Sequence, residues 1–259
     1  MPRILFIGDI VGKPGRTIVR ERLPALRSEL DIDVVIANAE NAASGKGITG
    51  ALAKELAQAG VDRMTLGDHV WDQRGFDGEI DSLDFICRPW NLPGGVPGRS
   101  WVSIGLSGGG TLGIATFLGR QFMKVTAGNL FEQIEAVFDV AGVDYWFIEV
   151  HAETTSEKVA AGWLLDGRAL AVVGTHTHIP TADGRVLPGG TAYLTDAGMT
   201  GPYASVLGRE VEPVIGALRD GMPRRFPVAR QDVRLCGCLI DFDAATGKAT
   251  AIERVEVGE

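Results

Sequence analysis

The chain has 259 residues, of which 45% are hydrophobic and 22% are charged, and this composition suits one fairly large globular domain or two small ones. Its formal net charge of -8 argues against broad electrostatic binding to duplex nucleic acid or to an anionic membrane. The short apolar start "RILFIG" runs directly into Asp9, and no apolar run approaches membrane-span length, so we expect a soluble protein without a signal peptide.

Strands and helices are predicted to alternate along the first part of the chain. The strand-like segments cover residues 3–9, 33–41 and 62–69, and the helical segments cover residues 15–30 and 49–60. Strands that alternate with helices at this spacing predict right-handed β-α-β units. We therefore expect a mainly parallel sheet.

The second part of the chain adds hairpins to this alternation. Residues 100–119 predict a β-hairpin that turns at Ser107–Gly110. A helix at 129–142, a strand at 144–151, a helix at 154–167 and a strand at 169–178 follow. Val233–Phe242 and Ala249–Val257 predict two paired strands. No linker, repeat or low-complexity segment is visible, so we predict one α/β domain over residues 1–259 that contains two sheets.

The three cysteines indicate a reducing compartment. Cys87, Cys236 and Cys238 do not form an even disulfide framework, which favours the cytoplasm. Cys236 and Cys238 lie two apart in a predicted strand and would need two further partners to bind a metal. We interpret them as small strand residues.

Polar residues follow each strong strand at the point where it ends. They are Asp9, Glu40 and Asn41, Asp68 and His69, His151, and His176 and His178, and they include all four histidines. In open α/β sheets the ligand crevice lies at the carboxyl ends of the strands, so these side chains are expected to meet. In "VVGTHTHIP", the alternation of an extended backbone places His176 and His178 on the same side.

The combination of these residues predicts a metal centre. Taken alone, Asp9 is explained as well by a helix N-cap, and a single histidine at a strand end is more often structural. Carboxylates and imidazoles without a thiolate suit iron, manganese, zinc or cobalt. Apart from His69, three carboxylates and three imidazoles are too many for one tetrahedral ion. They suit two ions about 3.5–4 Å apart, which lower the pKa of bound water and hold the hydroxide for in-line attack on phosphorus.

Five motifs resemble those of one enzyme family. "GDIVGKPGR", "NAENAASGKGIT", "GDHVWDQ", "HAETTSEK" and "GTHTHIPTAD" are similar to the YmdB-type metallophosphoesterases of the calcineurin-like superfamily, from Ile4 to about Gly208. The resemblance implies an α/β sandwich of two mixed β-sheets flanked by helices. It also implies hydrolysis of phosphodiesters, with cyclic nucleotides such as 2′,3′-cAMP and 3′,5′-cAMP as substrates. The metal centre would be dinuclear. The resemblance favours iron as its metal, then manganese, and zinc or cobalt less than either.

The resemblance also assigns roles to the residues at the strand ends. The first ion would take Asp9, the bridging Glu40 and His178, with Asn41 as an additional candidate. The second ion would take Glu40, Asp68, His151 and His176. His69 would face the substrate and protonate the leaving alkoxide or stabilise the phosphoryl oxygens. No residues are assigned to binding the rest of the substrate.

The chain departs from the family pattern at Asp68. The usual motif is G-N-H, whereas this chain has "GDH", so a carboxylate replaces a neutral amide. A third carboxylate favours a higher total metal charge and lowers the Lewis acidity felt by the bridging water. This departure bears on metal preference and on the level of activity.

Two other functions compete with a phosphodiesterase. Amidohydrolases also use H-x-H, but on the first strand of a (β/α)₈ barrel, whereas the pair here follows a late strand. The second is a non-hydrolytic, metal-stabilised nucleotide-binding or regulatory protein, which the departure at Asp68 keeps open. Near the site, Asp72 either orients His69 or caps a helix, and Asp196 either supports the site or forms a turn. The sequence is compatible with a homo-oligomer and leaves the oligomeric state open.

Overall fold

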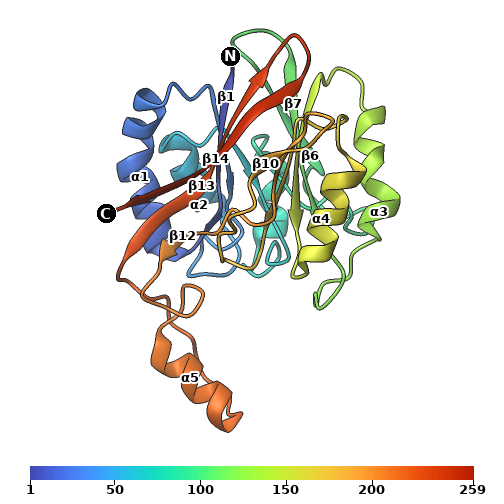
Figure 1. Ribbon diagram of the computed structural model, residues 1–259. Helices are drawn as coiled ribbons and strands as arrows, with labels where there is room; N and C mark the ends of the chain where they lie inside the picture. The colour runs from blue at the N-terminus through green and yellow to red at the C-terminus, as the bar shows by residue number, and fades with distance from the viewer.

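The computed structural model describes residues 1–259 and arranges them in four layers (Figure 1). Two β-sheets lie face to face in the middle. Helices α1 (Gly12–Glu29) and α2 (Gly50–Gln58) cover the outer face of one sheet, and α3 (Leu130–Gln133) and α4 (Thr155–Leu164) cover the outer face of the other. The expected sandwich of two mixed sheets flanked by helices is confirmed.

The first sheet combines a parallel core with antiparallel strands from the end of the chain. Its order is β2-β12-β13-β1-β3-β4-β5, and β14 also pairs with β13. The strands are β1 (Arg3–Ile7), β2 (Asp9–Ile10), β3 (Val34–Asn38), β4 (Arg63–Thr65), β5 (Ile86–Cys87), β12 (Met199–Pro202), β13 (Val233–Asp243) and β14 (Lys248–Gly258). Strands β1, β3, β4 and β5 run parallel, whereas β13 is antiparallel to β1 and to β14.

The second sheet repeats this plan. Its order is β10-β11-β9-β8-β7-β6. The strands are β6 (Trp101–Gly105), β7 (Thr111–Leu118), β8 (Tyr145–His151), β9 (Ala171–Thr175), β10 (Arg185–Val186) and β11 (Ala192–Leu194). The four central strands are parallel, and β6 and β10 add antiparallel edges. The predicted hairpin over 100–119 is confirmed as β6 and β7.

Side-chain alternation along the strands fills three apolar cores. In β1, Ile4 and Phe6 point into the core between the sheets, and Leu5 and Ile7 point into the core under α1 and α2. This explains why the strand is apolar from Ile4 to Ile7, since both faces are buried there. Phe6 meets Phe147 of the other sheet with ring centroids 5.0 Å apart, so the two sheets are joined by aromatic packing.

Two segments differ from the sequence-based expectation. The helix expected over 129–142 is wrong in part, because only α3 is α-helical and a 3₁₀ helix, η3 (Ile134–Asp139), continues it. Val137 and Phe138 lie in this stretch, and β-branched and aromatic residues have low helix propensity. Helix α5 (Val211–Asp220) was not expected, and it lies apart from the main body (Figure 1). None of the helices combines the length and the apolar content that a bilayer span requires.

We expect the burial of Phe147 between the sheets to contribute strongly to the stability of the sandwich. Phe147 is fully buried, so Phe147→Ala should lower the free energy of unfolding by about 3–5 kcal/mol through lost burial and a cavity. Urea denaturation measures this value. Phe122 is 86% exposed, so Phe122→Ala is the matched control and should change stability by less than about 0.5 kcal/mol. Equal effects of the two substitutions would contradict this account.

Candidate metal centre

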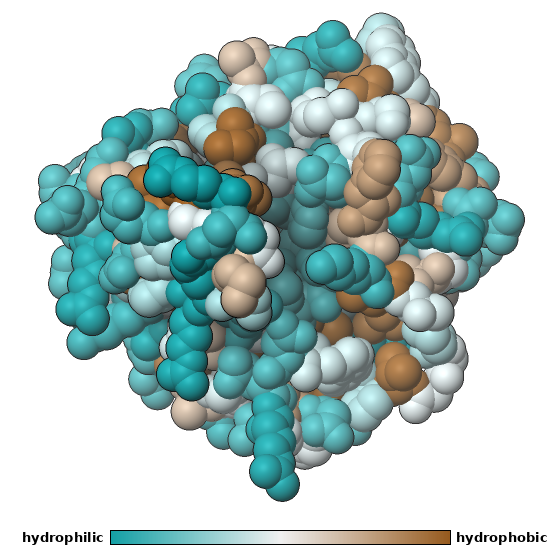
Figure 2. All heavy atoms as spheres, turned by 90° about the horizontal axis from the view of Figure 1, so that it is seen from below, coloured by the Kyte–Doolittle hydropathy of each residue, from teal (hydrophilic) through white to brown (hydrophobic).

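The predicted site residues lie at one end of the sandwich, where the parallel strands of both sheets end. They are Asp9 at the start of β2, just after β1, Glu40 and Asn41 after β3, Asp68 and His69 after β4, His151 at the end of β8, and His176 and His178 after β9. Parallel strands end at the same edge, so residues far apart in the sequence meet there. Seen from below, this end of the molecule is mainly hydrophilic and is hollowed near its middle (Figure 2).

Four of these residues form a tight cluster of donor atoms. One ligand atom each from Glu40, Asp68, His151 and His176 lies within 4.8 Å of the others. His151 Nε2 is 3.1 Å from Glu40 Oε1 and 3.0 Å from Asp68 Oδ1. His176 Nδ1 is 3.2 Å from the same Asp68 oxygen and 3.1 Å from His151 Nε2. Two ligands bound to one ion at right angles, each about 2.1 Å from it, are about 3.0 Å apart. The cluster therefore has the spacing of ligands around a single cation.

A second group of donors adjoins the first through Glu40. Asn41 Nδ2 is 3.1 Å from Glu40 Oε1, 3.4 Å from Asp9 Oδ1 and 3.3 Å from His178 Nε2. His178 Nε2 is 3.9 Å from Asp9 Oδ1. Rotation of the Asn41 amide would present its oxygen at the same place. The structure thus brings all seven expected ligands together, and Glu40 borders both groups. This donor set, with carboxylates and imidazoles but no thiolate, fits iron, manganese, zinc or cobalt.

His69 lies beside the donor cluster without adding its ring to it. Its backbone N–H donates to Glu40 Oε2 over 2.9 Å. Its ring Nδ1 lies 2.9 Å from Asp72 Oδ2, and the ring lines the pocket in front of the donors. Of the two roles considered for Asp72, the structure therefore favours orienting His69. The geometry leaves Nε2 of His69 free to meet a ligand.

The two histidines of "THTH" reach the site by a route that was not expected. The prediction of an alternating strand at His176 and His178 is wrong, because β9 ends at Thr175 and the two residues have φ of 91° and 65°. Both are held in the left-handed region, which non-glycine residues adopt only when their surroundings impose it. Both side chains still face the donor groups. A turn, and not strand alternation, directs them.

Asp196 and Lys158 hold that turn in place. Asp196 Oδ2 accepts hydrogen bonds from the Thr177 backbone N–H over 3.2 Å and from Thr177 Oγ1 over 2.8 Å. The same oxygen accepts a bond from Lys158 Nζ over 2.7 Å, and both charged side chains are buried. Since Thr177 lies between the two histidines, this ion pair fixes the backbone on either side. Sequence reasoning missed Lys158 because nothing marks a lysine of an amphipathic helix as buried.

A buried network orients His151 from behind. Thr175 Oγ1 donates to Glu149 Oε1 over 2.5 Å, and Asn38 Nδ2 donates to the same oxygen over 2.6 Å. Thr175 Oγ1 then accepts from His151 Nδ1 over 2.8 Å, which leaves Nε2 to face the donor cluster. Glu149 was missed, although strand alternation in "WFIEVH" places it on the same side as His151.

The charges of the cluster depend on one another. Burial alone would raise the pKa of Glu40 and of Asp68, but the neighbouring imidazoles outweigh it and both pKa values are lowered. Burial alone would lower the pKa of His151, but Glu40, Asp68 and Glu149 outweigh it and its pKa lies well above 6.5. The cluster thus keeps its carboxylates charged and offsets them with a proton on His151. A cation that binds here takes over this role and displaces the proton.

The fold, two mixed sheets flanked by helices, is that of a solved calcineurin-like phosphoesterase. The crystal structure of the calcineurin-like phosphoesterase YfkN from Bacillus subtilis shares this fold, with a TM-score of 0.56 and 17% identity over 99% of this chain and 90% of that chain. A family model described as YmdB-like protein matches residues 5–255, and the chain belongs to this family.

Two closer relatives extend over nearly the whole chain. A 2′,3′-cyclic-nucleotide 2′-phosphodiesterase from Bacillus subtilis (strain 168) is 44% identical over 258 residues, which cover 99% of this chain and 97% of that protein. A crystal structure of a protein from Thermus thermophilus has a TM-score of 0.93 and 40% identity, and the match covers 99% of both chains. The whole architecture described above is therefore shared with the Thermus thermophilus protein.

Gly67 offers a direct test of the donor cluster. A Cβ atom at this position would lie 2.3 Å from Glu40 Oε2 and 2.4 Å from His151 Nε2. We expect Gly67→Ala to separate these two donors and to abolish metal retention, measured by elemental analysis of the purified protein. Gly78 has no atom within 4 Å of the corresponding position, so Gly78→Ala is the control and should keep its metal. Full metal content in a folded Gly67→Ala variant would rule out the cluster as the binding site.

Proposed function

We propose that this chain hydrolyses small phosphodiesters at a centre of two metal ions. The substrates we propose are cyclic nucleotides, of the 2′,3′-cAMP or 3′,5′-cAMP type. The observation that carries this proposal is the meeting of two donor groups at the buried carboxylate of Glu40. The relative that is 44% identical supports the 2′,3′ cyclic phosphate as the first candidate.

We propose iron as the preferred metal, with manganese next; the carboxylate and imidazole donors are compatible with both. We assign Asp9, Asn41 and His178 together with Glu40 to one ion, and Glu40 together with Asp68, His151 and His176 to the other. We assign no role to the cysteines, which are free and buried, because none of them belongs to the donor cluster. These free cysteines also support our proposal of a reducing cytoplasm as the compartment.

Residues of the chain itself bind and orient the reacting groups. A bound pair of such ions supplies Lewis acidity to phosphoryl oxygens and activates water. Asp72 holds Nδ1 of His69, so that Nε2 can carry a proton to the leaving ribose oxygen. The turn at Thr177 and the network behind His151 keep the imidazole donors in position. Because the donors come from both sheets, we propose that residues 1–259 act as one catalytic domain.

Metal content and turnover test the proposal together. We expect about two ions per chain in freshly purified protein, and Glu40→Ala should lose both, since the two donor groups share this residue. The metal-loaded protein should hydrolyse bis-p-nitrophenyl phosphate and at least one cyclic nucleotide. Turnover at background with manganese, iron and cobalt would overturn the proposal and favour a non-hydrolytic nucleotide-binding or regulatory protein.

His69 provides a separate test of the proton transfer. His69→Ala should lower turnover about 10²–10⁴-fold, because the leaving oxygen loses its proton donor. Its metal content should stay at the wild-type level, since the ring does not join the donor cluster. Kinetics and elemental analysis on the same sample measure both quantities. Metal loss in this variant would reassign His69 as a ligand.

A further inference from the structure

The segment between β12 and β13, residues 203–232, forms one wall of the pocket in front of the metal donors; we call this segment the excursion. The pocket has a volume of about 420 Å³, within the range of about 300–1,000 Å³ for small-molecule sites. Glu40, Asn41, His69, His176 and His178 line its metal side. Val206, Leu207, Arg209, Val214 and Phe226 also line it, and all five lie between β12 and β13. The pocket therefore has a donor-rich side and a mainly apolar side.

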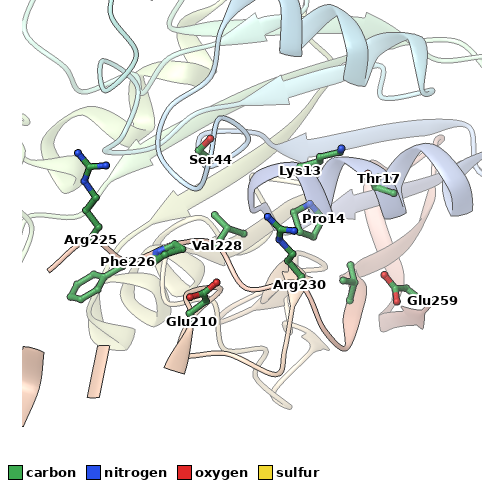
Figure 3. A pocket seen from close by; sticks show the side chains of 12 residues that line it. Lys13, Pro14, Thr17, Ser44, Glu210, Arg225, Phe226, Val228, Arg230 and Glu259 are labelled. Carbon is green, nitrogen blue, oxygen red and sulfur yellow. The ribbon is translucent and has the colours of Figure 1, made fainter. Parts of the chain in front are cut away.

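The apolar side keeps large side chains accessible to a ligand. Leu207 is 48% exposed and Phe226 is 41% exposed. Phe226 also borders an adjoining cavity of about 730 Å³, where its ring lies at the edge and extends away from Lys13 and Glu259 (Figure 3). Exposed apolar side chains in a concave site are typical of ligand contacts, and an aromatic ring offers a flat one.

Arg209 holds this wall against the loop that follows β3. Its guanidinium donates to the backbone carbonyls of Ser44 over 3.0 Å and Phe226 over 3.2 Å, and also to the carbonyl of Gly45. Its hydrogen-bond partners are all backbone carbonyls and it forms no ion pair, so its positive charge at the pocket is not offset by a neighbour. Arg209 thus fixes the backbone of Phe226 and adds a charge suited to an anionic ligand.

We propose that Phe226, with Leu207 and Val206 beside it, binds the base of a nucleotide whose phosphate faces the metal donors. This inference rests on the proposed function and adds the residues that recognise the nucleoside. A cyclic nucleotide has an anionic end and a flat aromatic end, and the pocket has a matching side for each. Stacking on an aromatic ring tolerates every base, because every base has a π-face. The enzyme is therefore expected to discriminate strongly between nucleotides and base-free phosphodiesters, and weakly between bases.

The test compares a nucleotide with its base-free counterpart. With the metal-loaded enzyme, Phe226→Ala should raise KM for 2′,3′-cAMP roughly 5- to 150-fold, the range expected for loss of one base–aromatic contact. Its kcat/KM for ribose 2,3-cyclic phosphate should stay unchanged, and Phe226→Trp should restore the wild-type KM for 2′,3′-cAMP. Leu218 is 81% exposed on the same excursion and outside the pocket, so Leu218→Ala is the control and should match wild type.

A binding measurement separates this inference from the proposed function. By calorimetry, wild type should bind adenosine 3′-monophosphate more tightly than ribose 3-phosphate, and Phe226→Ala should remove the difference. If no diester is hydrolysed but this difference is found, the proposed function fails and the base site stands. If Phe226→Ala weakens the binding of adenosine 3′-monophosphate and of ribose 3-phosphate equally, the base site is overturned. It is also overturned if Phe226→Ala weakens the binding of neither compound.

Discussion

The site depends on the cost of placing carboxylates where water cannot reach them. Asp9 and Glu40 are buried at the end of the sandwich, and a buried charge persists only with a compensating partner. Burial raises the pKa of Asp9, while the imidazoles beside Glu40 and Asp68 lower theirs. Positive charge is thus required at this point of the fold, and the arrangement of donors follows from that requirement. A metal ion satisfies it more completely than a single proton can.

A second set of buried charges keeps the ligands where the first set needs them. The left-handed residues His176 and His178 would not hold their conformation alone, and the ion pair of Lys158 with Asp196 stabilises the backbone between them. Removing one partner of such a pair typically costs about 3–5 kcal/mol, because the other is left uncompensated. Buried charges therefore have two roles: one set forms the candidate ligands, and the other stabilises the turn that carries two of them.

Most of the fold and the set of strand-end residues could be predicted because they follow from local patterns. Apolar runs predict the strands, and the β-α-β order places their carboxyl ends together. The turn at His176 could not be predicted, since it depends on Asp196 and Lys158, which are distant in sequence. The roles of Phe226 and Arg209 could not be predicted for a related reason. They lie on an irregular excursion without periodicity, and only the three-dimensional pocket gives them a role.

The division of the donors between two sheets has a mechanical consequence. Glu40 and Asp68 follow strands of one sheet, whereas His151 and His176 lie at the ends of strands of the other. An ion held by all four would therefore link the two sheets at one end. The aromatic contact of Phe6 with Phe147 joins them further inside. The free energy of metal binding would then add to the free energy of unfolding, since an ion that binds only the folded state stabilises it. Removal of such an ion would weaken the contact between the two sheets at this end first. Catalytic activity and the cohesion of the two sheets would then be lost together.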